Sequence, residues 1–496
     1  MHAIVNAGLH AASSFSPNPI NDPPGHVNSG DNAWVLASAA LVLFMTPGLA
    51  FFYAGMVRRK NVLGMIMQNW VVMGLVGVVW VLLSYSLAFG VDWGGFGFIG
   101  TFHFAGLAHI DTQGVPGNSA LTISPIVFVV FQMMFAVITP ALITGTTADR
   151  MKFGSFCVFI VAWSILVYAP IAHWVFSPTG WLFMRGAEDF AGGSVVHINA
   201  AMGGLGLLLV LKNRRGWPGT PMKPHNVPFT VLGAGILWFG WFGFNAGSAL
   251  AANNLSAHAF LNTNTATAMA VLGWIGVEKI KNGKSTTLGG ASGAVAGLVA
   301  ITPSCGYVNL AGSLVIGLAA GSLCALACSL KFRFKRDDAL DVLGVHFVGG
   351  MLGAVLIGFF GTNVFNSSAR NGLFYGGGWG LLGEQCLDVV CVAGFSLAMS
   401  YVIALVIDKT MGLRVTAEDE ETGLDISQHE EVAYDFDSAL SGLRSAFGSD
   451  LSATPARSAQ SVSSAQSVSS TEPDSPAGPS AGPVNPGASV NTEAKS

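Results

Sequence analysis

Long stretches of the chain carry almost no charge, and this feature most constrains the fold. Apolar windows of about 20 residues recur along the first 409 positions of a 496-residue chain. As helices, such windows match the hydrocarbon core of a bilayer, which is about 30 Å thick. Only 10% of the residues are charged, against about a quarter in a typical soluble domain. The chain is therefore expected to cross a membrane repeatedly.

Helices and closed barrels are the structures that satisfy backbone hydrogen bonds in lipid, and the windows lack the alternation of barrel strands. We predict an all-α polytopic membrane protein with eleven transmembrane helices. The predicted spans are 32–56, 62–90, 122–146, 153–176, 190–212, 228–249, 260–279, 286–302, 308–330, 339–362 and 384–408.

The basic residues of the connections predict the orientation. With the N-terminus outside, the inner connections hold sixteen Lys and Arg residues, and the outer connections hold only Arg185 and Arg370. The inner residues are Arg58, Arg59, Lys60, Arg150, Lys152, Lys212, Arg214, Arg215, Lys223, Lys279, Lys281, Lys284, Lys331, Arg333, Lys335 and Arg336. The C-terminus, which begins with Lys409 and Arg414, is then cytoplasmic.

Four regions follow from this topology. We expect an extracellular N-terminal tail at 1–31, an eleven-helix domain at 32–409, an acidic cytoplasmic regulatory segment at 410–437 and a disordered Ser/Ala/Pro-rich cytoplasmic tail at 438–496. Nine acidic residues lie from Glu418 to Asp437. In the last region Arg444 directly precedes Ser445, which we expect as a phosphorylation site for a cytoplasmic kinase.

A short internal repeat predicts how the helices are arranged. Phe52-Tyr53-Ala54-Gly55 in the first span aligns with Phe244-Asn245-Ala246-Gly247 in the sixth. The fifth span of each half carries an Asp followed by a His, namely Asp189 with His197 and Asp341 with His346. Copies five spans apart enter from opposite sides, so we predict an inverted 5+5 repeat plus a final helix. Such repeats place a substrate path between the halves.

His197 and His346 are the ionisable residues that this topology brings deep into the membrane from opposite sides. A core histidine with a satisfied ring is the alternative reading of each one alone. Ionisable residues inside a bilayer are costly and usually functional, and two neutral imidazoles can share one hydrogen bond. Their matched places in the repeat favour a conducting path.

Aromatic residues and a hydroxyl form the second part of the predicted site. Phe131 and Phe135 are four residues apart and share a helix face. A cation that loses water needs π faces, worth roughly 0.5–2 kcal/mol each, although most of the 33 Phe and 12 Trp residues fill the bundle or face lipid. The other candidates are Trp163, Trp241, Phe244 and Ser248.

Enzymatic chemistry is not indicated. The sequence contains no nucleophile–base pair, metal-ligand cluster or phosphate loop, and "GASGAVAG" is read as helix packing. We therefore expect no cofactor, no metal and no nucleic-acid partner.

Seven stretches of the sequence resemble the ammonium transporter family (Amt/Mep/Rh), and most of all the fungal high-affinity ammonium permeases. The resemblance spans residues 45 to about 425 and rests on "MTPGLAFFYAGMVRRKNVL", "FQMMFAVITPALITGTTADRMKF", "YAPIAHWVF", "DFAGGSVVHINAA", "LWFGWFGFNAGSA", "DVLGVHFVGG" and "GLRVTAEDEETGLD". It implies a plasma-membrane homotrimer of eleven-helix subunits, surrounded by lipid, each with its own narrow pore for ammonium or methylammonium.

The resemblance also implies roles for individual residues. Trp163, Phe135 and Ser248 would form an outer recruitment site, with Phe131 in its aromatic wall. Phe135 and Phe244 would stack as the gate, and His197 and His346 would be the twin histidines of the pore. Trp241 would line the lower wall, and Asp189 would organise the outer site without contacting substrate.

Two other functions stay open at this stage. A neutral-gas channel of the Rh type, for NH3 or CO2, has no need for an aromatic cage. A sensor that signals nitrogen status is compatible with the long C-terminal extension.

Overall fold

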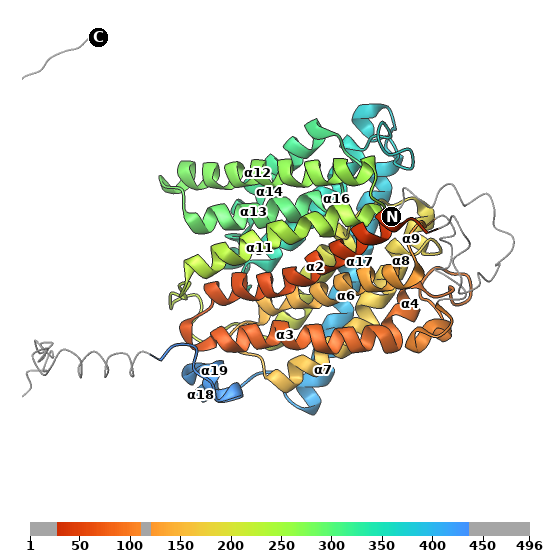
Figure 1. The fold of residues 1–496 in the computed structure, drawn as a ribbon. Helices are drawn as coiled ribbons and strands as arrows, with labels where there is room; N and C mark the ends of the chain where they lie inside the picture. The colour runs from red at the N-terminus through yellow and green to blue at the C-terminus, as the bar shows by residue number, and fades with distance from the viewer. Residues whose placement is uncertain (1–26, 111–120, 436–496) are drawn as a thin grey trace, which may run out of the picture. The chain divides into compact units, whose positions relative to one another are not determined.

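The computed structural model describes residues 27–110 and 121–435, and Figure 1 shows its fold. In these residues the regular structure is helical, and the β pairing is limited to isolated bridges such as Asp92 with Gly100. Nine helical stretches are long and apolar enough to cross a membrane. Two more complete the predicted eleven: α12 (Asn254–Asn282), which is long but more polar, and α13 (Thr287–Ile301), which is apolar but shorter.

The predicted all-helical membrane fold is confirmed, with most span boundaries shifted by only a few residues. The nine stretches are α2 (Ser29–Met56); α3 (Val62–Val79) with η2 (Trp80–Ser84) and α4 (Tyr85–Phe89); α6 (Pro125–Thr147); α7 (Phe153–Trp163) with η4 (Ser164–Tyr168) and α8 (Ala169–Phe176); η5 (Gly193–Ile198) with α10 (Asn199–Leu211); α11 (Val227–Ala246) with η6 (Gly247–Ala249); α14 (Leu310–Ala327) with α15 (Leu330–Phe334); η7 (Leu343–Phe347) with α16 (Val348–Phe360); and α17 (Gly380–Thr410).

Polar caps set where several helices begin. Asn28 accepts hydrogen bonds from the first free N–H groups of α2, which therefore starts three residues earlier than its apolar run. Asn253, Thr286 and Asn309 do the same for α12, α13 and α14. Pro125 begins α6 at a position where its missing N–H costs nothing.

The first helices of the two halves pack antiparallel against each other, α2 on α11, and the two ribbons lie side by side in Figure 1. Glycines allow this approach. A Cβ on Gly233 would lie 2.2 Å from the backbone nitrogen of Phe52, and one on Gly55 would lie 2.6 Å from that of Thr230. Because lipid gives helices no hydrophobic reason to associate, close backbone contact of this kind holds the halves together. The inverted repeat is thereby built into the core.

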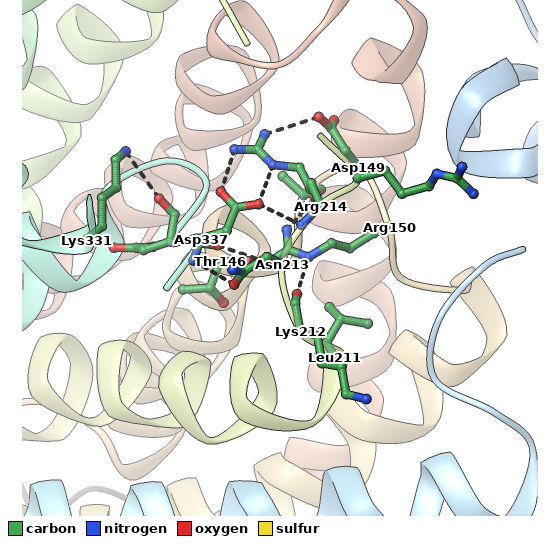
Figure 2. Close-up of polar contacts among 12 residues, drawn as sticks. Thr146, Asp149, Arg150, Leu211, Lys212, Asn213, Arg214, Lys331 and Asp337 are labelled. Atoms are coloured by element: carbon green, nitrogen blue, oxygen red, sulfur yellow. Dashed lines mark hydrogen bonds and ion pairs between the residues drawn. The ribbon is translucent and has the colours of Figure 1, made fainter. Parts of the chain in front are cut away.

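The connections that carry the sixteen basic residues gather at one end of the bundle, which we call the basic end. A buried chain of charges joins several of them. Arg214 contacts Asp149 and pairs with both oxygens of Asp337, at 2.8 Å each (Figure 2). Arg58 also contacts Asp149. Buried ions of this kind are stable only when fully paired.

Arg150 is fully buried in the same cluster, and among the described residues its hydrogen bonds go to backbone carbonyls. Its acceptors are Thr146, Ala148, Lys212 and Asp337 (Figure 2). Burial lowers the pKa of Arg150 to about 10, so it remains charged at neutral pH. Arg150 therefore clamps connections from both halves.

The acidic segment after α17 folds onto the basic end as two short helices, α18 (Ala417–Thr422) and α19 (Leu424–His429). Thr416 and Asp419 form a capping box at the start of α18. Glu420 accepts from Arg414 at 2.6 Å and from the backbone of Arg215 at 2.7 Å. Ser445 and the region 438–496 lie outside the described residues.

Candidate functional site

The two histidines meet inside the bundle. The Nδ1 atoms of His197 and His346 are 3.3 Å apart, and their rings lie 5.3 Å apart at 25°. Both side chains are buried, with 1% and 2% exposure. In this hydrogen bond one imidazole donates and the other accepts. Nε2 of His197 has no hydrogen-bond partner among the described residues. The sequence prediction that these two residues are partners agrees with this placement.

A cavity surrounds the pair and is otherwise apolar. It is lined by Met45, Leu49, Ile138, Leu142, Val196, His197, Leu237, Trp241, Phe244, Val295 and His346. Trp241 stacks on His197, with ring centres 5.3 Å apart, and its indole N–H is held by Thr302 at 2.8 Å. The cavity therefore offers a permeating molecule two imidazoles and very little else that is polar.

Equivalent caps place the two histidines. Asp189 accepts from the backbone N–H groups of Gly192, Gly193, Ser194 and Val195 at 2.7–3.2 Å, and from the Ser194 hydroxyl at 2.7 Å. These donors are the free N–H groups at the start of η5, which a carboxylate satisfies best.

In the second half the corresponding residue is Asp338, whose Oδ2 accepts from the backbone of Leu343 at 2.7 Å. The sequence analysis matched Asp341, not Asp338, to Asp189 in the repeat, and the hydrogen bond corrects that match. Asp338 lies eight positions before His346, as Asp189 lies eight before His197. Three positions after each cap stands a left-handed residue, Gly192 with φ 115° and Asp341 with φ 61°. Asp341 instead pairs with Lys331 at 2.7 Å.

Both histidines lie within π-helical turns. His197 lies in η5 and His346 in η7, where each helix makes one wide turn before it continues as an α-helix. A π turn inside an α-helix shifts the direction of the side chains and often marks a functional site. The helix period of the sequence gave no sign of these turns.

A second pocket lies beyond the cavity, at the end of the bundle opposite the basic end. It is lined by Gln132, Phe135, Phe176, Phe190, Ser248 and Leu250. The rings of Phe135 and Phe244 are 4.3 Å apart, and Phe131 packs edge-on against Phe135 at 4.9 Å. Because Phe244 lines the cavity and Phe135 lines the outer pocket, this ring pair separates the two spaces.

Ser248 is oriented to accept a proton donor. Its hydroxyl donates to the carbonyl of Phe244 at 2.7 Å. The hydroxyl proton is therefore engaged, so an N–H group of a ligand would meet this oxygen as an acceptor.

Trp163 does not belong to the outer pocket, and that prediction is corrected by its position. It is fully buried on α7, where its indole donates to the Ser400 hydroxyl on α17 at 2.9 Å. Gly203 on α10 gives it room, since a Cβ there would lie 2.9 Å from the indole nitrogen. Trp163 thus packs three helices together. Besides Phe135, the aromatic residues of the pocket are Phe176, at the end of α8, and Phe190, and the sequence reading missed both.

Among the residues that the structure describes, no group of three or more His, Cys, Asp and Glu side chains could hold a metal ion.

Comparisons with known proteins identify relatives over most of the chain. A model of the Ammonium Transporter Family matches residues 33–434. An ammonium transporter of Mycobacterium tuberculosis is 50% identical over 436 residues, which cover 83% of this chain and 91% of the relative. Ammonium transporter 1 of Schizosaccharomyces pombe is 41% identical over 414 residues, which cover 82% of each chain.

Solved structures agree with these matches. The crystal structure of Saccharomyces cerevisiae Mep2 superposes with a TM-score of 0.77 at 31% identity, over 85% of this chain and 98% of that one. A structure described as a sensor Amt protein superposes with a TM-score of 0.74 at 28% identity, over 81% of this chain and 98% of that one.

Proposed function

Since this chain belongs to the ammonium transporter family, we propose that it carries ammonium from outside into the cytoplasm, either as NH4+ or as NH3 plus H+. The observation that carries the proposal is the buried pair His197 and His346 in an otherwise apolar cavity, directly behind an aromatic pocket with a hydroxyl acceptor.

The outer pocket is the recruitment site in this proposal. A small cation gives up part of its hydration there, and the faces of Phe135 and Phe176 offer cation–π contacts in exchange. The Ser248 oxygen accepts one N–H bond. Phe131 supports the wall through its contact with Phe135. Asp189 acts on the path indirectly, because its oxygens are engaged by backbone and hydroxyl donors of its own segment.

The pair Phe135 and Phe244 is the gate. Its rings are in contact at 4.3 Å, so passage requires at least one to turn aside. A hydrated metal cation of similar charge cannot recover its lost water in the apolar cavity behind the gate. Ammonium that releases its proton at the gate crosses that cavity as neutral NH3, at much lower cost.

The histidine pair guides the molecule through the cavity. Two neutral imidazoles that share one hydrogen bond leave one N–H donor and one lone-pair acceptor, which suits a molecule that both donates and accepts. Trp241 holds the orientation of His197 by stacking on it. The proton needs its own route, and transport is electrogenic if that proton also enters.

An Rh-type neutral-gas channel is the alternative. The aromatic pocket and the Ser248 acceptor favour a site that recruits a cation, because a gas-conducting pore gains nothing from them.

The setting of the protein belongs to the same proposal. The basic end faces the cytoplasm by the distribution of Lys and Arg, and the plasma membrane is where uptake from outside occurs. Each chain contains a complete cavity between its own helices, so a homotrimer would hold three separate paths. Lipid covers the exposed apolar faces, for example at Trp70, Val78 and Leu82 on the α3–α4 stretch.

The segment 410–437 is proposed as a regulatory element. It contacts the connection 211–215 through Arg414 and Glu420, and that connection is itself clamped by Arg150 and Asp337. Displacing the segment would release one side of this cluster. A kinase acting on Ser445 and a role as an ammonium sensor are consistent with such a link.

Reconstituted protein in sealed vesicles tests the function. We expect uptake of labelled methylammonium and an ammonium-evoked inward current that does not occur with potassium. Uptake without current, at several pH values, would favour the neutral-gas channel. Neither uptake nor current from folded protein would refute both.

A further inference from the structure

Asp388, on the last spanning helix α17, has a buried carboxyl group that the proposed path does not use. Its side chain is 1% exposed, and its Oδ1 has no hydrogen-bond partner among the described residues. An ionised carboxylate without partners is very costly inside a membrane. The protonation state of Asp388 therefore needs an explanation.

The packing of α17 places Asp388 beside the cap of η5. The helix runs parallel to the segment 188–206, and its side chains keep one register along that length. Gln385 bonds the backbone nitrogen and oxygen of Glu188 at 2.7 and 2.8 Å. Three contacting pairs share a separation of 197 positions: Glu188 with Gln385, Asn199 with Ser396, and Gly203 with Ser400.

By this register Asp388 lies at the level of Ala191, between the cap residue Asp189 and Ser194. The Ser194 hydroxyl lies within interaction range of the Asp388 carboxyl group, and Asp189 is close enough to interact with it electrostatically. Two carboxyl groups therefore share one hydroxyl in a region shielded from water.

A hydroxyl has a single proton to donate, and here it is directed to Asp189 Oδ2 at 2.7 Å. Asp189 also receives four backbone N–H groups, which fix it as the ionised member. The Ser194 oxygen can then only accept from Asp388. A carboxyl group donates only when it carries a proton, and two adjacent carboxylates cannot both be ionised at low dielectric.

We propose that Asp388 is a neutral carboxylic acid whose O–H donates to Ser194, so that it acts as a positioning residue for the capped start of η5. The chain Asp388, Ser194, Asp189 then carries a single negative charge. It joins α17 to the turn that places His197. Its effect on transport rests on the proposed function, whereas the protonation state does not.

Two substitutions separate the hydrogen-bond donor of Asp388 from its acidic proton. Asp388→Asn keeps a donor of similar size without the acid, and Asp388→Leu keeps the size but has no donor. Cys386→Ala, at an exposed position of the same helix, is the matched control.

Infrared absorption of the purified full-length protein measures the protonation state directly. We expect the wild type to show a carbonyl band of a protonated carboxylic acid that shifts in D2O and is missing in Asp388→Asn. If Asp388→Asn instead lost a band of an ionised carboxylate, the proposal would be overturned. This measurement does not depend on what the protein transports.

Methylammonium uptake by the vesicle-reconstituted variants measures the positioning role. We expect Asp388→Asn to stay within about twofold of the wild type and Asp388→Leu to lose about tenfold, because it leaves the Ser194 oxygen without its donor. If folded Asp388→Asn were as inactive as Asp388→Leu, the acidic proton itself would be required and a positioning role would be wrong. Wild-type uptake by both variants would also overturn that role. If Asp388→Leu does not fold, the infrared band and the Asp388→Asn rate still decide.

Discussion

At the scale of single residues, His197 and His346 bear the proposed function most directly. Replacing either by Ala removes one of the two imidazoles of the central cavity and breaks their mutual contact, while the apolar walls and the cap at Asp189 remain. We expect His197→Ala to fold and insert normally but to lose selective ammonium transport, measured as uptake and as exclusion of potassium. His346→Ala is the matched variant from the other half. Transport at the wild-type rate with unchanged selectivity would refute the histidine mechanism.

The aromatic residues separate into two groups, and substitution distinguishes them. Phe135→Ala removes half of the gate and should cause a leak of other small cations. Phe176→Ala should raise the half-saturating concentration several-fold, since one cation–π contact is worth roughly 0.5–2 kcal/mol. Trp163→Leu should instead lower the melting temperature with little change in affinity, because it leaves the Ser400 hydroxyl unpaired between helices. Concentration dependence of uptake and thermal melts check all three. If Trp163→Leu changed affinity alone, its assignment to packing would fail.

Glu188 lies outside the membrane spans, and its titration should make the stability of the protein depend on pH. Burial raises the pKa of Glu188 from its ordinary value of 4.5 to about 8, although the backbone N–H and the charge of Arg370 act in the opposite direction. The folded state therefore binds a proton that the unfolded state has released. The resulting stability is complete below about pH 4.5 and is lost as the pH rises through about 8.

Glu188→Gln removes this titration. We expect its melting temperature to vary less than that of the wild type between about pH 5 and pH 9. Glu384→Gln, which alters a carboxylate paired with Arg185 at the surface, is the control. If the melting temperatures of the wild type and of Glu188→Gln changed with pH in parallel, the assignment of this titration to Glu188 would be wrong.

Trp163 and Phe176 also show a limit of sequence reasoning at this scale. Both precede the Asp189 cap on the same stretch of chain, and both are aromatic. A single sequence does not tell which helix face meets the path, since aromatic residues in this chain also fill the bundle. The glycine at 203 and the serine at 400 that receive Trp163 lie on other helices, so the sequence offered no local signal.

At the scale of elements, the two caps make a prediction about symmetry. Asp189→Ala leaves the start of η5 with unpaired N–H groups, and we expect it to lose transport through misplacement of His197. Asp189→Asn keeps one oxygen acceptor and should retain more activity. Asp338→Ala, which uncaps η7, should act in the same direction through His346. Uptake by all three variants, normalised to membrane amount, tests this. If Asp189→Asn transported no more than Asp189→Ala, capping would not be the explanation.

The helices were predictable because apolar length and charge-free windows depend on composition alone. The wide turns η5 and η7 were not, because one π turn barely changes the spacing of apolar residues. The sequence analysis also matched the wrong aspartate, Asp341 in place of Asp338, to Asp189. Counting back from His346 to the nearest Asp gives 341, whereas the hydrogen bond to Leu343 and the left-handed position of Asp341 identify 338.

At the scale of the molecule, the basic end joins elements that are far apart in sequence. The sequence predicted that the acidic segment and the sixteen basic residues lie on the same side of the membrane. It did not reveal that the acidic segment forms two helices, although Thr416 and Asp419 have the spacing of a capping box. The contacts are specific: Asn61 accepts from the backbone of Leu424, and Asp425 accepts from that of Gly64, each at 2.8 Å. The α2–α3 connection is thus bound directly by α19.

Truncation tests whether this docking controls transport. Ending the chain at 437 leaves every contact of α18 and α19 in place, so we expect a transport-competent pore whose control alone is altered. Ending it at 413 removes Arg414, which donates to Leu211 and Asn213, and Glu420, which accepts from Arg215. The connection at 211–215 then loses its outer support, and we expect uptake to fall severely. Arg414→Gln in the full chain is a milder version of the same change, because it keeps the length but loses the ion pair with Glu420. Uptake normalised to surface amount decides the question: equal activity in both truncations would mean that the acidic segment has no gating role.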